Sequence, residues 1–155
     1  MDLYFQGWAC LYRGMNPAYN VRARGFFSRA LLLDPCSVEA LVGSATVDQQ
    51  TATGSFSDDR IERLKAAETA ATKALSLAPN HAKAHHILGR IFAFTNRAAQ
   101  GMAECERALM LDRNLANAHA SIGMMKYFVG QGAETEAHVR EALRLSPATV
   151  EYTCG

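Results

Sequence analysis

Residues 74–79 read Ala-Leu-Ser-Leu-Ala-Pro, and this stretch occurs in closely similar form four times along the 155-residue chain. The alanines that begin the four copies are residues 30, 74, 108 and 142, so the copies are spaced by 44, 34 and 34 residues. Alanine and leucine at helical spacing favour a helix that packs inward, and the proline that closes three of the copies cannot continue a helix. The chain is therefore expected to repeat one unit that ends in the same way each time.

A second helix is predicted upstream of each of these stretches. In residues 80–94 the apolar side chains recur at the spacing of one helix face, and residues 114–128 have the same layout. Gly89 and Gly123 lie 34 residues apart inside these two segments. Because a glycine within a helix costs about 1 kcal/mol relative to alanine, its recurrence indicates a close approach between two helices.

The sequence thus predicts four pairs of helices. They cover residues 2–13 with 17–33, 37–50 with 58–77, 81–94 with 98–111, and 115–128 with 133–145. Residues 51–57 (Thr-Ala-Thr-Gly-Ser-Phe-Ser) predict a loop, which accounts for most of the longer 44-residue step. Ser57 or Asp58 is expected to cap the helix that follows it. Residues 148–155 are interpreted as a tail or as the start of a truncated further helix.

In its 34-residue unit the chain resembles the tetratricopeptide repeat (TPR) family, whose pattern is W-x2-L-G-x2-Y…A-x3-F…P. The third unit places His85, Leu88-Gly89 and Phe92 at the Trp, Leu-Gly and Tyr positions. The resemblance implies an all-α, right-handed superhelical array of antiparallel helix pairs. It implies a single domain over residues 1–155, with about four repeats at approximately 2–35, 36–79, 80–113 and 114–147. The chain also resembles the repeat regions of bacterial multidomain signalling and regulatory proteins.

The TPR resemblance implies that the first helix of each pair lines a concave, protein-binding groove. The groove-facing residues that spacing selects form a mixed basic, polar and apolar surface; they are Lys83, His86, Arg90, Phe94, Asn117, Met124 and Tyr127. Such a surface suits a peptide or protein segment with apolar anchors and an acidic group. The expected function is therefore that of a protein-interaction module whose ligand the sequence does not identify.

The first predicted helix supports an alternative, self-association. It has few charged residues, and its apolar and aromatic side chains point to every side of the helix; they are Leu3, Tyr4, Phe5, Trp8, Leu11 and Tyr12. An isolated surface of that kind favours a partner, so the alternative function is a homo-oligomerisation scaffold, such as a homodimer joined through this helix. Residues 3–7, Leu-Tyr-Phe-Gln-Gly, also form the core of a cleavage site used to remove purification tags. The native helix and the remnant of such a site both stay open as interpretations.

Composition and motifs argue against several other functions. The 16 Lys and Arg nearly balance the 15 Asp and Glu, which disfavours a nucleic-acid partner. No apolar run reaches the length of a membrane span and no secretory leader is visible. No phosphate loop or nucleophile elbow is present, so no enzyme activity and no cofactor are expected.

Histidine and cysteine are the candidate metal ligands. His81 and His85 are spaced to bind one metal ion, but the ligands needed to complete a site are missing, so no metal is predicted. His85 and His119 are instead expected to pack between helices. The cysteines are scattered and predict reduced, buried thiols in a cytoplasmic protein; they are Cys10, Cys36, Cys105 and Cys154.

Overall fold

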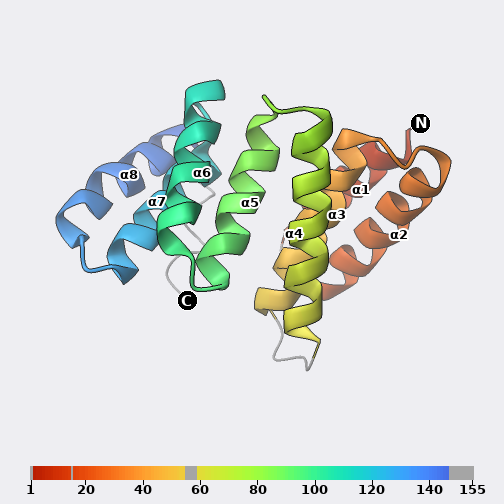
Figure 1. Ribbon diagram of the computed structural model, residues 1–155, viewed down its shortest axis with the longest axis horizontal. Helices are drawn as coiled ribbons and strands as arrows, with labels where there is room; N and C mark the ends of the chain where they lie inside the picture. Colours follow the sequence, from red (N-terminus) through yellow and green to blue (C-terminus); the bar gives the residue numbers. More distant parts are fainter. Residues whose placement is uncertain (1, 15, 55–58, 147–155) are drawn as a thin grey trace. The chain divides into compact units, whose positions relative to one another are not determined.

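The computed structural model describes residues 2–14, 16–54 and 59–146, and the regular structure in these ranges is entirely α-helical. The chain divides into two compact units, which cover residues 1–79 and 80–155. The division falls between the second and third predicted repeats, directly after Pro79. Each unit contains two helix pairs, as the ribbon shows (Figure 1). The predicted all-α repeat architecture is therefore confirmed.

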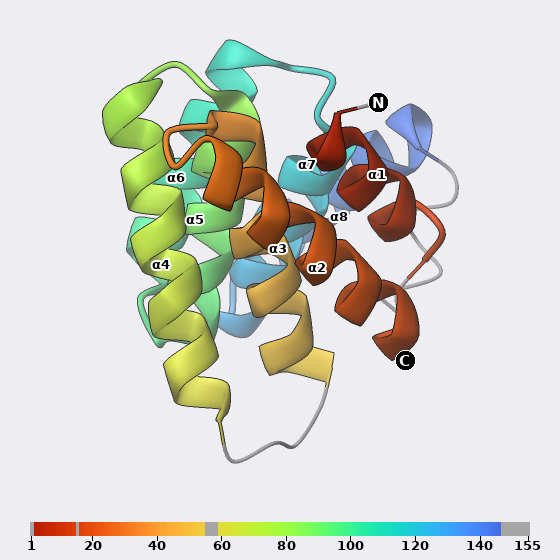
Figure 2. The ribbon, with the colours of Figure 1, turned by 90° about the vertical axis from the view of Figure 1, so that its right-hand side faces the viewer.

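The first unit contains α1 (Leu3–Leu11), α2 (Pro17–Leu33), α3 (Val38–Gly54) and α4 (Arg60–Leu77). Each helix packs on the next one in the chain, as α1, α2, α3 and α4 show in Figure 2. In addition, α1 packs on α3. The second unit has the same pattern in α5 (Ala82–Phe94), α6 (Ala98–Leu111), α7 (Ala116–Phe128) and α8 (Gly132–Leu145), where α5 also packs on α7. Contact between a helix and the next but one is what stacked helix pairs produce.

Phe27 of α2 fills the centre of the first unit. Its side chain is fully buried, and the edge of its ring meets the Trp8 indole at a centroid distance of 5.7 Å. A side chain at Gly7 of α1 or at Gly43 of α3 would collide with the Phe27 ring. The two glycines therefore let the backbones of α1 and α3 lie directly against one aromatic ring.

The first helix covers most of its apolar surface within this unit. Its half-buried residues pack against the core around Phe27; they are Leu3, Tyr4, Trp8, Cys10 and Leu11. Phe5 and Tyr12 remain 57% and 71% exposed. The apolar surface available to a second copy is thus smaller than an isolated helix would present.

In the second unit the close approach is between backbones. A Cβ atom added at Gly89 of α5 would lie 2.6 Å from the Cys105 sulfur and 2.7 Å from the Gly101 carbonyl oxygen of α6. At Gly123 the nearest atom, a methyl carbon of Val139, would be 3.3 Å away. The predicted close helix approach is therefore confirmed at Gly89 and is looser at Gly123.

The helix boundaries differ from the predicted ones mainly in α3, which continues to Gly54. The predicted loop was wrong for residues 51–54, because Ala52 is buried and the hydroxyl of Thr51 donates to the Val47 carbonyl at 2.7 Å. Residues 55–58, including the predicted caps at Ser57 and Asp58, lie outside the described residues, as do residues 147–155.

The cysteine prediction was only partly right. Cys105 is buried, but Cys10 is half-buried and Cys36 is exposed; all three are free thiols, and Cys154 is outside the described residues. Among the described residues, none of the helices combines the length and apolar character needed to cross a bilayer.

Candidate functional site

The predicted groove residues lie on α5 and α7, two helices that pack against each other. On α5 their spacing of three or four residues defines one helix face, and on α7 steps of seven and three residues also keep them on one face. We call this surface the α5–α7 surface; it comprises Lys83, His86, Arg90, Phe94, Asn117, Met124 and Tyr127.

Accessibility varies strongly across the α5–α7 surface. Tyr127 is 68% exposed, and Lys83 and Asn117 are also exposed. The apolar side chains of Phe94 and Met124 are half-buried, and so is the charged side chain of Arg90. His86 is only 8% exposed, so it belongs to the floor of this surface rather than to its open wall.

His86 links the two helices through Ser121, a residue that spacing alone did not select. The Ser121 hydroxyl donates to the Asn117 carbonyl at 2.8 Å, and the His86 Nε2 atom lies 3.1 Å from the same hydroxyl oxygen. Because that hydroxyl has only one proton, the Nε2–H of His86 must be the donor. Burial, assisted by the nearby Arg90 charge, lowers the pKa of His86 to about 3, so its imidazole is neutral at pH 7.

Arg90 differs from the other arginines that lie between helices. Its guanidinium has no hydrogen bond and no ion pair with any residue that the structure describes, although the side chain is half-buried. Burial lowers the pKa of Arg90, but a guanidinium stays protonated in proteins. The α5–α7 surface therefore contains a positive charge that the described part of the chain does not neutralise.

The remaining histidines form helix contacts and caps. His85 is buried, and its Nδ1 atom lies 2.6 Å from the Glu104 carboxylate, which joins α5 to α6 as the sequence predicted. His119 is half-buried between α7 and α8, with its Nδ1 atom 3.5 Å from that of His138. His81 accepts a hydrogen bond from the backbone of Ala84 at the start of α5. In the described ranges, no three His, Cys, Asp or Glu side chains are grouped so that they could hold a metal ion.

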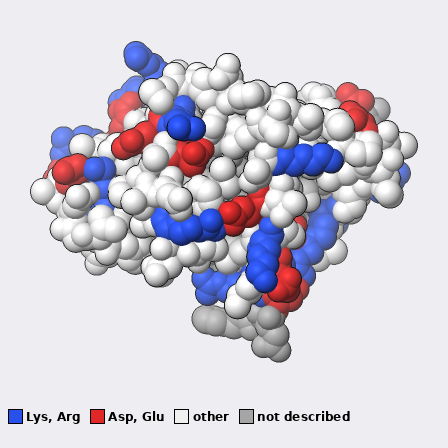
Figure 3. Space-filling view, viewed as in Figure 1, with Lys and Arg blue, Asp and Glu red and all other residues white. Residues whose placement is uncertain are grey.

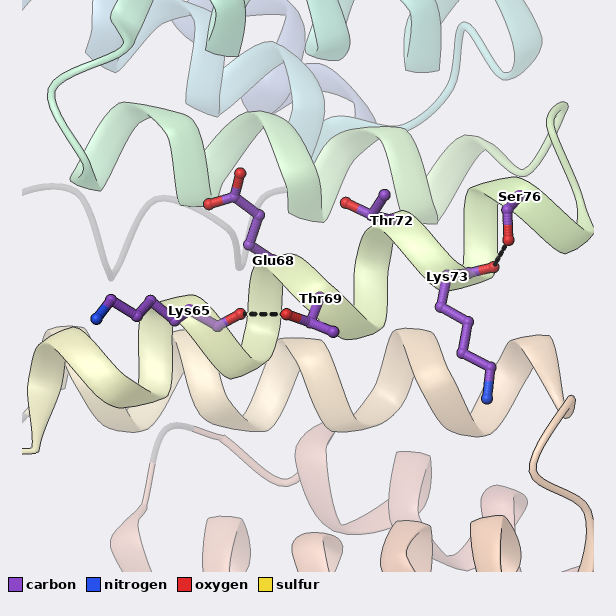
Figure 4. Close-up of a pocket in the computed structure, with 6 residues that line it drawn as sticks. All are labelled: Lys65, Glu68, Thr69, Thr72, Lys73 and Ser76. Atoms are coloured by element: carbon purple, nitrogen blue, oxygen red, sulfur yellow. Dashed lines mark hydrogen bonds between the residues drawn. The ribbon is translucent and has the colours of Figure 1, made fainter.

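A depression of about 720 Å³ runs along α4 (Figure 4) and is lined by Lys65, Glu68, Thr69, Thr72, Lys73 and Ser76. Its polar groups are largely used within the first unit. The hydroxyls of Thr69 and Ser76 donate to carbonyls of the preceding helical turn, and the Lys73 ammonium donates to the Pro35 carbonyl at 2.8 Å. The depression is therefore a weaker candidate for a binding site than the α5–α7 surface.

The charges on the face shown in Figure 3 are mixed. Lysine and arginine lie beside aspartate and glutamate, with many uncharged residues between them. This distribution agrees with the nearly equal numbers of basic and acidic residues in the sequence. This face therefore does not present the uniformly positive potential that would attract a polyanion.

The fold is that of tetratricopeptide repeat proteins, as comparison with solved structures shows. A thermophilic TPR protein of Thermus thermophilus, TTC0263, is 16% identical with a TM-score of 0.79, over 96% of this chain and 75% of that one. MamA of Desulfovibrio magneticus RS-1 is 20% identical with a TM-score of 0.66, over 96% and 76%. PilF of Pseudomonas aeruginosa is 19% identical with a TM-score of 0.70, over 94% and 60%. No family model and no curated protein matches the sequence.

Proposed function

We propose that the chain is a non-catalytic interaction module that binds a protein or peptide segment on the α5–α7 surface. The most direct support is that two packed helices bring together different side chains suited to a protein ligand. They are the exposed Tyr127, the half-buried Phe94 and Met124, and the cation of Arg90, which has no partner among the described residues. Aromatic, methionine and arginine side chains are enriched where proteins bind one another. The TPR fold of the chain agrees with such a role.

The absence of an enzyme activity is part of this proposal. Two buried histidines already serve helix contacts, His85 with Glu104 and His86 with Ser121. We also propose a cytoplasmic location, where the exposed thiol of Cys36 would stay reduced, and no nucleic-acid partner. A place within a larger bacterial regulatory protein stays a prediction from the sequence.

Selection from a random library of dodecapeptides on the immobilised chain tests the proposed function. Peptides that are enriched should bind the wild-type chain by fluorescence polarisation and should bind a Met124→Ala, Tyr127→Ala variant at least about tenfold more weakly. Met110→Ala is the matched control, because Met110 is as large as Met124 but lies exposed on α6. The proposal fails if no peptide is enriched or if Met110→Ala weakens binding as much as the double variant.

A second candidate function, self-association through α1, is favoured by Phe5 and Tyr12. The two exposed side chains are seven residues apart and therefore lie on one face of α1. A Phe5→Glu, Tyr12→Glu variant should reduce the mass that light scattering reports at high protein concentration. A wild-type chain that stays monomeric at every concentration measured would exclude this function.

A further inference from the structure

The starting point is the charge distribution over the helices of the second unit. Neither α5 nor α7 contains an Asp or a Glu, whereas their basic residues are Lys83, Arg90 and Lys126. The acidic residues of this unit's helices are on α6 and α8; they are Glu104, Glu106, Glu134, Glu136 and Glu141. The α5–α7 surface is therefore positive by composition.

Most of these acids already have a basic partner. Glu104 is paired with His85, Glu134 with Lys126, and Glu141 with Arg144. Lys126 of α7 thus has its charge neutralised by α8. Arg90 has no such acid among the described residues, because the Glu104 carboxylate is directed to His85 and to Arg107 of its own helix.

The groups next to Arg90 do not offset the free-energy cost of its unpaired positive charge. His86, one helical turn before Arg90 on α5, is neutral, and its partners are the Ser121 hydroxyl and the α7 backbone. None of these groups supplies a negative charge. The Arg90 side chain is half-buried as a whole, and burial of its guanidinium is the main cause that lowers its pKa. A guanidinium that has lost water and gained no acceptor is at a higher free energy than one paired with a carboxylate.

Resting on the proposed function, we propose that Arg90 is the receptor for an Asp or Glu side chain of the bound protein segment. A carboxylate accepts two parallel hydrogen bonds from one guanidinium, which gives direction as well as affinity. Phe94, one turn further along α5, and Met124 of α7 contact the apolar residues beside that acid. The partner is therefore an acidic segment with apolar anchors.

The position of Arg90 along α5 favours a side-chain carboxylate over the end of a chain. Lys83 lies two turns before Arg90 and Phe94 one turn after it, so the α5–α7 surface continues on both sides of the guanidinium. A segment that contacts all three must extend past the arginine in both directions. The chain terminus of a ligand would leave one side of the surface without a contact.

The experiment uses the whole chain and dodecapeptides selected on it, each synthesised once with an amidated and once with a free C-terminus. The wild-type chain should select sequences enriched in Asp and Glu, and replacing the shared Glu by Gln should weaken binding roughly tenfold to a hundredfold. Arg90→Gln should cause the same loss, with no further loss when the peptide also contains Gln. Arg90→Lys should recover part of the affinity, because lysine keeps the charge and loses the planar geometry.

Arg140→Gln is the matched control, since Arg140 lies exposed on α8 and is paired with Glu136; it should bind the peptides as the wild type does. If Arg90→Gln does not fold by circular dichroism, the Glu-to-Gln peptides on the wild-type chain decide the question. Enriched peptides without acids, or peptides that bind Arg90→Gln as tightly as wild type, would overturn the assignment of Arg90. In that event the proposed function stands if the Met124→Ala, Tyr127→Ala variant still weakens binding.

Two further outcomes also overturn the assignment. Binding that needs a free C-terminal carboxylate and ignores internal acids would show that the ligand is a chain end. A library that yields no binding peptide would reject this inference and the proposed function together.

Discussion

The two units differ in how they treat an arginine that lies between helices. In the first unit, the Asp48 carboxylate of α3 lies 2.7 Å from the Arg24 guanidinium of α2 and 3.5 Å from that of Arg63 of α4. In the second unit, Arg90 has no acid partner among the described residues. The first unit shows that this fold can place an acid beside an interhelical arginine. The lack of an acid beside Arg90 is therefore specific to the α5–α7 surface and is not imposed by the helical repeat.

The units also differ in how neighbouring helices are brought together. The first unit places one large ring, Phe27, against two glycines, whereas the second places the backbone of Gly89 against that of Gly101. A ring can shift its rotamer when a neighbour changes, but a helix backbone moves only as a whole. The two units are therefore expected to tolerate amino-acid substitutions between helices differently. Each of the following predictions tests one of the two units.

Phe27→Ala should have the largest effect on stability. The ring is fully buried and contacts both α1 and α3, so its removal leaves a cavity that the flanking glycines cannot fill. The free energy of unfolding should fall by about 3–5 kcal/mol, measured by urea denaturation. Phe128→Ala is the matched control, because Phe128 is exposed on α7 and its loss should cost less than about 1 kcal/mol.

The buried His86 should make the second unit sensitive to acid. With its pKa near 3 in the folded state and near 6.5 when unfolded, His86 takes up a proton mainly in the unfolded chain between these values. Its contribution to stability is complete above pH 6.5 and decreases as the pH falls, by about 2 kcal/mol between pH 7 and pH 5.

His86→Gln should remove this pH dependence. Urea denaturation of both proteins at pH 7 and pH 5 measures the difference, and the wild type should lose more stability than the variant. Equal losses in the two proteins would mean that His86 is protonated in the folded state, which would contradict the neutral imidazole inferred from its burial.

The fold could be predicted from the sequence because its signals are periodic and local. The recurring Ala-Leu-x-Leu stretch placed the ends of α2, α4, α6 and α8, and the repeated glycine of the first helices indicated close packing. The loop at residues 51–57 was predicted too early, since the buried Ala52 extends α3. Threonines in that stretch donate to helix carbonyls instead of starting a turn, a choice that composition does not reveal.

The candidate site was less predictable, because partners across helices depend on contacts. Spacing selected Arg90 and His86 for one face of α5, yet it could not distinguish an open cation from a buried neutral histidine. Ser121 was missed, since its neighbour Ala120 fits the same helix face almost as well. One signal for the open charge was present from the start, the lack of any Asp or Glu in residues 82–94 and 116–128.

Gly89→Ala should separate backbone packing from side-chain packing. Alanine normally stabilises a helix by about 1 kcal/mol over glycine, but here its Cβ would lie 2.7 Å from the Gly101 carbonyl oxygen. The collision should outweigh that gain and lower the free energy of unfolding by about 1–2 kcal/mol.

Gly123→Ala is the matched control, because its Cβ would lie 3.3 Å from one methyl group of Val139, a side chain that can shift. This variant should be neutral or slightly more stable than wild type in thermal denaturation. If both alanine variants are destabilised alike, α5 and α6 are no closer to each other than α7 and α8 are.

Asp48→Asn should have the smallest effect, although it removes the acid that two arginines share. Burial raises the pKa of Asp48 more than Arg24 and Arg63 lower it, so ionisation of this carboxyl is less favourable in the folded chain than in the unfolded one. At pH 7 the substitution should change stability by less than about 1 kcal/mol, as is common for partly exposed ion pairs.

Because the folded-state pKa lies above the unfolded value, the folded protein binds the proton more readily, and the advantage of wild type over Asp48→Asn should grow as the pH falls toward 4. Urea denaturation at both pH values measures this difference. If the stability advantage of the wild type instead shrinks as the pH falls, the two arginines lower the pKa of Asp48 more than burial raises it. Pairing an interhelical charge would then stabilise the fold, and the missing partner of Arg90 would cost the second unit more stability than we infer.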